Sequence, residues 1–256
     1  MSRPLAFVRS VPDSFARALT GVAPGSAIDV ALAREQHQQY IACLAGGGFG
    51  IERLDTPFDF PDGPFIEDVA VLLIGTLVST RPGVPSRRGE VTGVGEALAA
   101  RFELRSIDPP GTLEGGDVLQ LGGRIYAGRS SRTNDDGIRQ LAKITADLGI
   151  ETVPVQVRDT LHLKSVVTAL DAETLIAAPG HFNPEVFGKF RILWVEGEGE
   201  INTLRLPDGN VLVPSSKHAV QEVVAADGYG VVTVDVSEFE KADGGLTCLS
   251  LRTNDG

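Results

Sequence analysis

Short apolar runs alternate with longer amphipathic stretches along the whole chain. Residues 4–11 predict a strand, residues 27–48 an amphipathic helix that ends at glycines, and residues 50–54 another strand. The order of strand, strand, helix and strand then returns in residues 69–107, 116–157, 163–195 and 201–236. A recurrence of about 45 to 55 residues is typical of repeated supersecondary units.

The first unit lacks its opening strand, and the run LTCLSLR at residues 246–252 would supply it from the other end of the chain. This closure predicts a ring of five ββαβ units with pseudo-fivefold symmetry. From the repeat pattern alone, an ordinary open α/β sheet remains an equal alternative. Neither a low-complexity linker nor a composition shift divides the chain, so we expect one domain over residues 1–256.

Composition places the chain among ordinary globular proteins, with 42% apolar and 22% charged residues. Every apolar stretch is shorter than the roughly 18 residues that cross a bilayer. Arg3, Arg9 and Arg17 interrupt the N-terminal segment, where a signal peptide would have its apolar core. We therefore expect a cytoplasmic protein with no membrane partner, in a reducing compartment where both cysteines are free thiols.

The formal net charge of −11 bears on the choice of partner. Surfaces that bind nucleic acid need clustered Lys and Arg, so this charge argues against a nucleic-acid partner. It slightly favours a cationic small molecule. The oligomeric state is left open, with a homodimer as one candidate.

Three side chains of different chemistry stand at the starts of predicted strands. Cys248 follows a glycine pair, His162 opens an apolar run, and Glu114 precedes two glycines. Each alone is better explained as packing, a structural ring or a solvated turn. In a ring of repeated units, however, strand starts converge on the centre, and together these groups make up a nucleophile, an acid/base and an orienting carboxylate. Cys43 and His37 lie within the first predicted helix and are interpreted as structural.

A second group of charged residues precedes predicted strands and helices. Asp62 and the neighbours Glu67 and Asp68 stand directly ahead of a strand, where a solvated acidic turn is the simplest interpretation. Arg87 and Arg132 stand near predicted helix starts. Because the helix dipole does not favour cations there, an anionic partner would explain them, and Arg can bind a carboxylate through two parallel hydrogen bonds.

Six short stretches contain all of these candidates except Asp62, in a fixed order: FIED (65–68), RPGVPSRRGE (81–90), LEGGDVL (113–119), SSRTN (130–134), LHLKS (161–165) and DGGLTCLSL (243–251). In this order and spacing they resemble the dimethylarginine dimethylaminohydrolases, which belong to the guanidino-group-modifying enzymes. The resemblance runs from about residue 4 to residue 252. It implies the five-bladed α/β propeller, or pentein, fold of that superfamily, in agreement with the ring predicted from the repeats.

By position, the resemblance implies a role for each candidate. Cys248 matches the family's nucleophile, His162 its general acid/base, and Glu114 the carboxylate that holds both the guanidinium and the imidazole. The residues matched to substrate binding are Leu19, Asp62, Glu67, Asp68, Arg87, Arg132 and Ala242. Among these, Asp68 binds the guanidinium and Glu67 lies beside it. The others bind the amino-acid end, Leu19 and Ala242 through their backbone carbonyls.

The activity implied by the resemblance is hydrolysis of Nω-methylated arginines, both asymmetric dimethylarginine and monomethylarginine. Cys248 attacks the guanidinium carbon, dimethylamine or methylamine leaves, and water releases citrulline from a covalent thiouronium intermediate. The expected ligand is therefore a small guanidino compound, with no metal and no organic cofactor.

Rival functions remain on the same fold. Arginine deiminases share the nucleophile, as other guanidino hydrolases can. Arginine deiminases, however, usually have an inserted helical region. They also have an acidic residue two positions after the catalytic His, where this chain has Lys164. A non-catalytic binding protein, such as the ribosomal anti-association factor, has no need of Cys, His and Glu together with substrate-binding arginines. Two departures from the family pattern, Ala242 and the stretch GEINTLRL at 199–206, bear on substrate preference.

Overall fold

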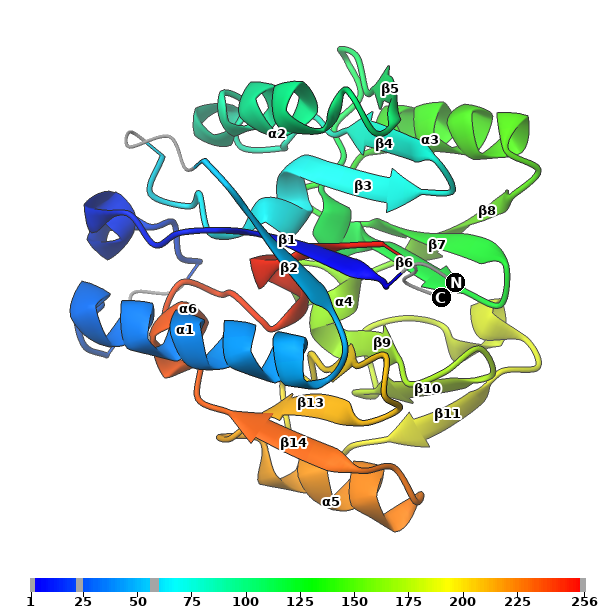
Figure 1. Ribbon diagram of the computed structural model, residues 1–256. Helices are drawn as coiled ribbons and strands as arrows, with labels where there is room; N and C mark the ends of the chain where they lie inside the picture. The colour runs from blue at the N-terminus through cyan, green and yellow to red at the C-terminus, as the bar shows by residue number, and fades with distance from the viewer. Residues whose placement is uncertain (1–2, 22–24, 56–59, 254–256) are drawn as a thin grey trace.

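The computed structural model describes residues 3–21, 25–55 and 60–253 and arranges the strands in five three-stranded sheets (Figure 1). The strands are β1 (Leu5–Arg9), β2 (Gly50–Leu54), β3 (Ala70–Leu73), β4 (Thr76–Ser79), β5 (Glu103–Ser106), β6 (Val118–Leu121), β7 (Arg124–Arg129), β8 (Glu151–Gln156), β9 (Val167–Ala169), β10 (Thr174–Ala177), β11 (Arg191–Trp194), β12 (Leu204–Arg205), β13 (Val211–Pro214), β14 (Val231–Val234) and β15 (Leu251–Arg252). The α-helices are α1 (Val30–Gly46), α2 (Glu90–Leu98), α3 (Asp135–Asp147), α4 (Leu163–Val166), α5 (His218–Ala226) and α6 (Ser237–Glu240). The 3-10 helices are η1 (Asp13–Arg17), η2 (Ile66–Val69), η3 (Pro85–Arg87), η4 (Gly115–Asp117), η5 (Pro184–Phe187) and η6 (Thr247–Leu249).

Four of the sheets are built from consecutive strands with the same topology. In β3–β4–β5, β6–β7–β8, β9–β10–β11 and β12–β13–β14, the middle strand is antiparallel to the first and parallel to the third. An antiparallel pair needs only a short turn, whereas a parallel pair needs a crossover connection. α2, α3, η5 and α5 supply these crossovers. The predicted ββαβ repeat is therefore confirmed.

The fifth sheet joins the two ends of the chain. β1 pairs in parallel with β2 and antiparallel with β15, which places Ala6 opposite Arg252 and Phe7 opposite Leu251. β1 and β15 accordingly lie side by side in Figure 1. The opening strands of the units contact one another around the centre, β15 with β3, β6 with β9 and β9 with β12. The closed ring is therefore confirmed, and the alternative of an open sheet is wrong.

One local prediction is wrong at the places that matter most for chemistry. The apolar patterns predict strands from residue 163 and from residue 246, but α4 and η6 come first, and β9 and β15 begin only at Val167 and Leu251. In the same way, η2 precedes β3 and η4 precedes β6. A helical turn directs successive side chains around the chain axis, so such a turn can present neighbouring residues to two sides of the ring centre.

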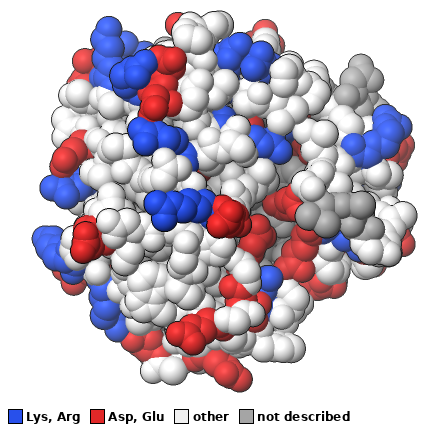
Figure 2. Space-filling view, turned by 180° about the vertical axis from the view of Figure 1, so that it is seen from behind, with Lys and Arg blue, Asp and Glu red and all other residues white. Residues whose placement is uncertain are grey.

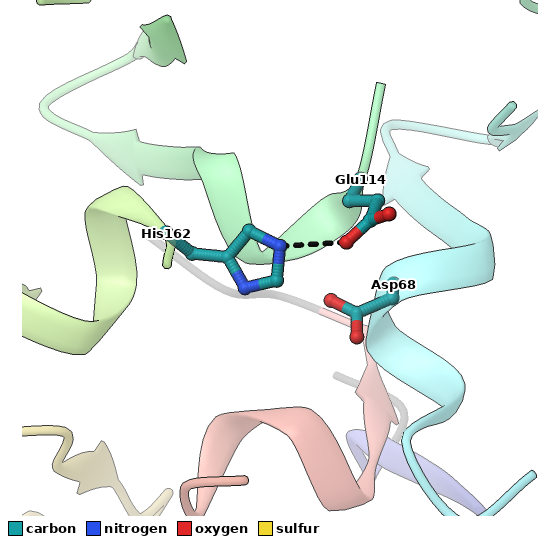
Figure 3. A group of neighbouring side chains, drawn as sticks. All are labelled: Asp68, Glu114 and His162. Carbon is teal, nitrogen blue, oxygen red and sulfur yellow. Dashed lines mark hydrogen bonds and ion pairs between the residues drawn. The ribbon is translucent and has the colours of Figure 1, made fainter. Parts of the chain in front are cut away.

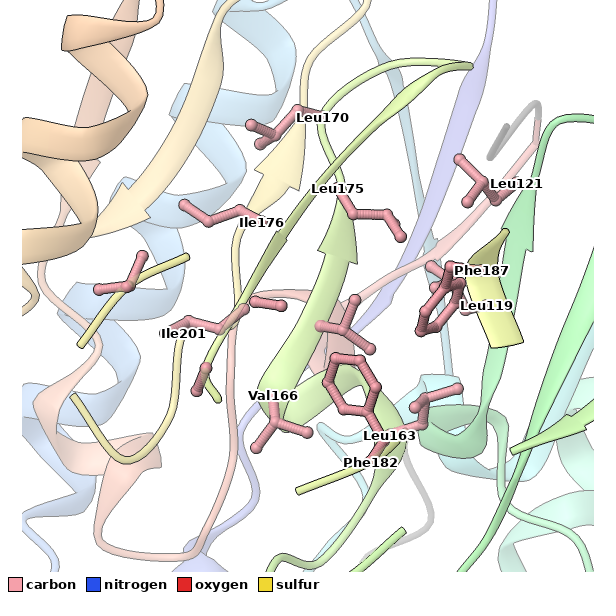
Figure 4. Close-up of a cluster of buried hydrophobic side chains, with 14 of the residues drawn as sticks. Leu119, Leu121, Leu163, Val166, Leu170, Leu175, Ile176, Phe182, Phe187 and Ile201 are labelled. Carbon is pink, nitrogen blue, oxygen red and sulfur yellow. The ribbon is translucent and has the colours of Figure 1, made fainter. Parts of the chain in front are cut away.

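Four clusters of buried apolar side chains fill the space between sheets and helices. The cluster in Figure 4 combines Leu163 and Val166 of α4 with Ile176 of β10 and with Phe182 and Phe187. β10 and β13 are buried along their whole length, as expected for strands covered on both faces. This core anchors the helical turn that directly follows His162.

The described residues contain no helix that is long and apolar enough to span a bilayer. On the face shown in Figure 2, basic and acidic side chains are interspersed, and the described residues form no continuous basic patch there. The cytoplasmic location, the absence of a nucleic-acid partner and the homodimer stay predictions.

His37 on α1 is buried beside Tyr40 and Phe239. Burial, followed by the charge of Arg53, lowers its pKa from 6.5 to about 4. Between pH 6.5 and about pH 4, the unfolded chain binds a proton at His37 that the folded protein does not bind. The stability of the folded state is therefore lost as the pH falls through this range. Between pH 7 and pH 5, the free energy of unfolding should fall by about 2 kcal/mol more in the parent protein than in His37→Gln.

Urea titrations of both proteins at the two pH values measure this difference. His218→Gln is the matched control because His218 is exposed on α5, and it should keep the pH dependence of the parent protein. Parallel losses of stability in the parent and in His37→Gln would contradict the prediction.

Candidate active site

One cleft at the ring centre gathers nearly all the residues that the sequence marks as candidates. Its lining contains Leu19, Asp62, Asp68, Arg87, Glu114, Arg132, His162, Ala242 and Cys248, together with Phe65, Leu161, Asp243 and Gly244. Asp68 lies on η2 and Cys248 on η6, while Glu114 and His162 stand directly ahead of η4 and α4. The predicted convergence of the chemistry on the centre of the ring is what the structure shows, with Glu67 as the exception described below.

His162 and Glu114 form a direct pair inside this cleft. Nε2 of His162 lies 2.7 Å from Oε2 of Glu114, and both side chains are buried (Figure 3). Burial opposes the charge on His162, but the charge of Asp68 and the hydrogen bond to Glu114 outweigh it and raise the pKa to about 9. Burial likewise opposes the charge on Glu114, but the bond to His162 prevails and lowers that pKa. At neutral pH the ring is therefore an imidazolium with a proton to give away.

Asp117 fixes the turn that follows His162. It is fully buried and accepts hydrogen bonds from the Leu163 N–H at 2.9 Å and from the Ser130 hydroxyl at 2.6 Å. Its negative charge also contributes to the raised pKa of His162. The sequence shows Asp117 only as a carboxylate after two glycines, because its partners are distant along the chain. Its positioning role was therefore missed.

Gly115 and Gly116 allow the η4 turn to approach its neighbours closely. A β-carbon on Gly115 would lie 1.9 Å from the carbonyl oxygen of Glu67, and one on Gly116 would lie 2.6 Å from Nδ1 of His162. The backbone of Glu67 and the buried ring of His162 cannot move away from a new β-carbon, whereas the end of a flexible side chain could. A larger residue at Gly115 would push the η4 turn away from η2, which holds Asp68, and one at Gly116 would separate the turns that hold Glu114 and His162.

Asn202 joins the turn after His162 to the turn that holds Cys248. Its amide nitrogen donates to the Lys164 carbonyl at 2.8 Å and to the Thr247 hydroxyl at 3.0 Å, and its amide oxygen accepts from the Thr247 N–H at 2.9 Å. A β-carbon on Gly245 would lie 2.6 Å from the Asn202 amide carbon. Asn202 belongs to the stretch at 199–206, so this stretch helps to hold the turn that carries Cys248.

The Cys248 thiol is protonated at neutral pH. Burial, followed by the charges of Asp68 and Glu67, raises the pKa of its thiol, while the Gly245 N–H and the charge of Lys164 act in the opposite direction. A cation placed beside the sulfur would offset these negative charges and favour the thiolate.

Asp68 and Arg87 form a second buried ion pair. Nη1 of Arg87 donates to Oδ2 of Asp68 at 2.7 Å. The other hydrogen bonds of Arg87 run to the Glu90 carboxylate and to the carbonyls of Asp62 and Phe65. Arg87 therefore orients Asp68. Its expected contact with the amino-acid end of a substrate stays a prediction.

Arg132 is the more accessible of the two arginines. Its side chain is 19% exposed, against 5% for Arg87, and its Nη1 makes only a long contact of 3.5 Å with Glu114. On the same rim, Asp62 accepts a hydrogen bond from the Leu19 N–H at 3.0 Å, and burial raises the pKa of Asp62. The rim thus offers an arginine that can turn toward an anion and a carboxylate that an ammonium would complement.

Glu67 is the candidate that the structure does not bring into this cleft. Its Oε1 accepts from Nζ of Lys164 at 2.6 Å and from Nη2 of Arg252 at 3.1 Å. These three residues line a separate cavity of about 290 Å³. The neighbours Glu67 and Asp68 therefore face different cavities, and a role for Glu67 beside the guanidinium stays a prediction.

Asp68, Glu114 and His162 also form a group whose ligand atoms all lie within 4.8 Å of one another (Figure 3). Carboxylates and imidazoles are common ligands of divalent cations, but a metal needs the neutral imidazole. Here the raised pKa keeps His162 protonated, and Glu114 engages its Nε2. The group therefore suits an organic cation with N–H donors better than a metal.

Known proteins resemble this chain over nearly its whole length. A family model described as arginine deiminase matches residues 101–193. Over 252 residues, the chain is 38% identical to the N(G),N(G)-dimethylarginine dimethylaminohydrolase of Streptomyces coelicolor, with 96% of each protein covered. Among solved structures, a cysteine-to-serine mutant of dimethylarginine dimethylaminohydrolase (DDAH) from Pseudomonas aeruginosa, complexed with citrulline, matches with a TM-score of 0.92 at 33% identity, covering 99% of this chain and 100% of that chain. A DDAH adduct with S-methyl-L-thiocitrulline matches with a TM-score of 0.93 at 33% identity, over 98% and 100% of the two chains.

The raised pKa of Cys248 predicts a slowly reacting thiol when no substrate is added. In a Cys43→Ser background, iodoacetamide should alkylate Cys248 slowly at pH 7 and pH 8, and the rate should climb only above pH 9, because the thiolate is the reacting form. Mass spectrometry of the intact protein measures the rate. A rate that reaches its plateau below pH 8 would contradict the raised pKa.

Proposed function

Because the chain belongs to the dimethylarginine dimethylaminohydrolase family, we propose that it hydrolyses Nω-methylated arginines to citrulline and dimethylamine or methylamine. The reaction passes through a covalent thiouronium intermediate on Cys248. The observation that carries the proposal is the meeting of a thiol, a protonated imidazole and two carboxylates in one buried cleft. These are the groups that bind a guanidinium and break one of its carbon–nitrogen bonds.

The two carboxylates bind the guanidinium. This group is a flat, delocalised cation and a poor electrophile, with N–H donors at its edges. Asp68 and Glu114 accept hydrogen bonds from the nitrogens that carry no methyl group and bring the central carbon beside Cys248. The bound cation also offsets the negative charges that keep the thiol protonated, so the substrate itself favours the thiolate.

His162 acts as an acid in the first half of the reaction. The thiol proton of Cys248 passes to solvent as the guanidinium binds, and the thiolate sulfur forms a bond to the guanidinium carbon. The bond from that carbon to the methylated nitrogen then breaks. The leaving nitrogen takes a proton from His162, whose pKa of about 9 keeps it protonated at neutral pH. Dimethylamine or methylamine departs, and the thiouronium remains on Cys248.

His162 acts as a base in the second half. Now neutral, it takes a proton from water, and the hydroxide adds to the thiouronium carbon. The carbon–sulfur bond breaks, citrulline leaves and Cys248 is regenerated. Glu114 accepts the hydrogen bond of the ring in both halves and stabilises the imidazolium whenever it forms.

The amino-acid end of the substrate binds at the rim of the cleft. Arg132 and Arg87 bind the α-carboxylate. Asp62 binds the α-ammonium, with the backbone carbonyls of Leu19 and Ala242. These five residues line the same cleft as the catalytic groups, and Asp62 is only 5% exposed, so an ammonium would offset the cost of burying its charge.

Arginine deiminase is the second candidate, because the family model of that name matches residues 101–193. That segment contains Glu114 and His162, which both activities require. Lys164, two positions after His162, donates to Glu67 in the separate cavity. At that position the chain therefore has no second carboxylate for the terminal nitrogens, and hydrolysis of methylated substrates is better supported.

Cys248→Ser should lower citrulline formation from asymmetric dimethylarginine by at least about 10³-fold, because the hydroxyl is a much weaker nucleophile at neutral pH. Circular dichroism should show an intact fold. Cys43→Ser is the matched control and should keep most of the activity, since Cys43 packs against a hydrophobic core on α1. Full turnover by the Cys248 variant would overturn the covalent mechanism.

The identity of the leaving group separates the two candidate functions. A site for asymmetric dimethylarginine must place the methylated nitrogen near His162, with apolar room that contributes on the order of 0.8 kcal/mol per methyl. Symmetric dimethylarginine has a methyl on each terminal nitrogen, so one carboxylate would lose its hydrogen bond and remain buried without a partner. We expect dimethylamine from the asymmetric isomer, methylamine from monomethylarginine and almost no product from the symmetric isomer.

The assay measures citrulline by colorimetry and the released amine by chromatography, with arginine as the fourth substrate. Ammonia from unmethylated arginine as the fastest reaction would contradict the proposed function and support the deiminase.

A further inference from the structure

A row of four ionisable side chains with alternating charge leads from the interior of the protein to the guanidinium-binding carboxylate. Its members, in order, are Arg9, Glu90, Arg87 and Asp68. Their exposed fractions are 0%, 1%, 4% and 4%. Only the last two line the cleft. The first two have no part in the reaction described above, so their burial needs a separate explanation.

Glu90, the first residue of α2, holds Arg87 through a two-pronged contact. Nε of Arg87 donates to Oε1 at 3.1 Å and Nη2 donates to Oε2 at 2.9 Å. This contact fixes the plane of the guanidinium and leaves Nη1 directed at Asp68, 2.7 Å away. The position of the Asp68 carboxylate is thus set from behind by Glu90, which itself does not line the cleft.

Arg9 stands behind Glu90 at the end of β1. Its Nη2 donates to the Glu90 carbonyl at 3.1 Å, and its Nε and Nη1 have no hydrogen-bond partner among the described residues. Burial raises the pKa of Glu90, and the charge of Arg87 opposes that rise. Burial lowers the pKa of Arg9, and the charge of Glu90 opposes that fall. Arg9 therefore supports Glu90 through a hydrogen bond to its backbone carbonyl and places a buried cation near it.

A row of four buried charges contributes little to the stability of the fold. Removing four charges from water is costly, and well-packed apolar residues often serve a fold as well as buried ion pairs do. A benefit at the site explains the arrangement better. We propose that Glu90, supported by Arg9, is a positioning residue for substrate binding, which holds Arg87 and through it Asp68; this inference rests on the proposed function.

The physical reason lies in the competition for Asp68. An arriving guanidinium must take a carboxylate that is already paired with Arg87. With Glu90 in place, Arg87 keeps a strong anionic partner and can release Nη1 toward the α-carboxylate of the substrate. Without the charge of Glu90, Asp68 becomes the main anion for Arg87, and the two close into a tighter pair that the substrate has to break.

The test is Glu90→Gln, which keeps the size of the side chain and removes its charge. We expect KM for asymmetric dimethylarginine to rise by about ten- to a hundred-fold while kcat changes by less than about three-fold. In a Cys248→Ser background, calorimetry should show the same loss of substrate affinity without turnover. Glu90→Asp keeps the charge and should fall between the parent protein and Glu90→Gln.

Glu238→Gln is the matched control. Glu238 is also buried, at 4% exposed, and its carboxylate pairs with Lys241 at 2.8 Å away from the cleft lining. Losing this charge can lower stability but should leave KM unchanged. Unchanged KM and unchanged affinity in Glu90→Gln, with a loss only in stability or in the yield of active protein, would overturn the inference.

The two levels of interpretation fail in different ways. If the proposed function is wrong, the parent protein releases no citrulline from methylated arginines. If only this inference is wrong, the parent protein releases citrulline and Glu90→Gln binds the substrate as tightly as the parent does.

Discussion

The structure depends on how closely the short helical turns at the ring centre approach one another. A β-carbon on Gly115 would lie 1.9 Å from a backbone oxygen, and one on Gly244 would lie 2.2 Å from the Phe65 ring. These distances leave room for hydrogen atoms alone. The closed ring requires the turns ahead of its inner strands to meet, and glycine at the contact points permits it. On Gly116 a β-carbon would lie 2.6 Å from Nδ1 of His162, and this close approach brings the Glu114 carboxylate within hydrogen-bonding distance of the ring.

Because the turns lie so close together, the carboxylates between them are buried, and burying their charges costs free energy. Asp62, Asp68 and Glu114 are each at most 5% exposed, so their charges are poorly solvated and depend on neighbouring cations. His162 responds with a raised pKa and the Cys248 thiol stays protonated. A cationic substrate relieves both the carboxylates and the sulfur. In the proposed reaction, the charge of the substrate therefore contributes to forming the Cys248 thiolate as well as to binding.

The same turns separate the chemistry from a second cavity. Asp68, Glu114 and Cys248 line the cleft, whereas the adjacent Glu67, Gly115 and Thr247 line the larger cavity. One helical turn is enough for this division, because successive side chains point in different directions around its axis. Lys164 lies on the far side with Glu67, so its ammonium stays out of the cleft that holds Cys248.

The sequence by itself predicted the ββαβ repeat, and the resemblance of its six short stretches to a known family favoured the closed ring and pointed to Cys248, His162 and Glu114 as the reacting groups. Apolar periodicity revealed β10 and β13 because buried strands are continuous apolar runs, and Cys248, His162 and Glu114 stood out because each interrupted a predicted strand start. Periodicity could not separate a helical turn from the beginning of a strand, so α4 and η6 were predicted as strands.

Tertiary structure alone decided which side of each turn a residue faces and which distant groups meet. In the folded protein, Glu67 lines the other cavity. Asp117 accepts a hydrogen bond from the Leu163 N–H, and Glu90 accepts two from Arg87. The sequence around a residue shows which positions are apolar and with what spacing they recur. The partner of a buried charge is chosen by the packing of several units, and that choice leaves no local signal in the chain.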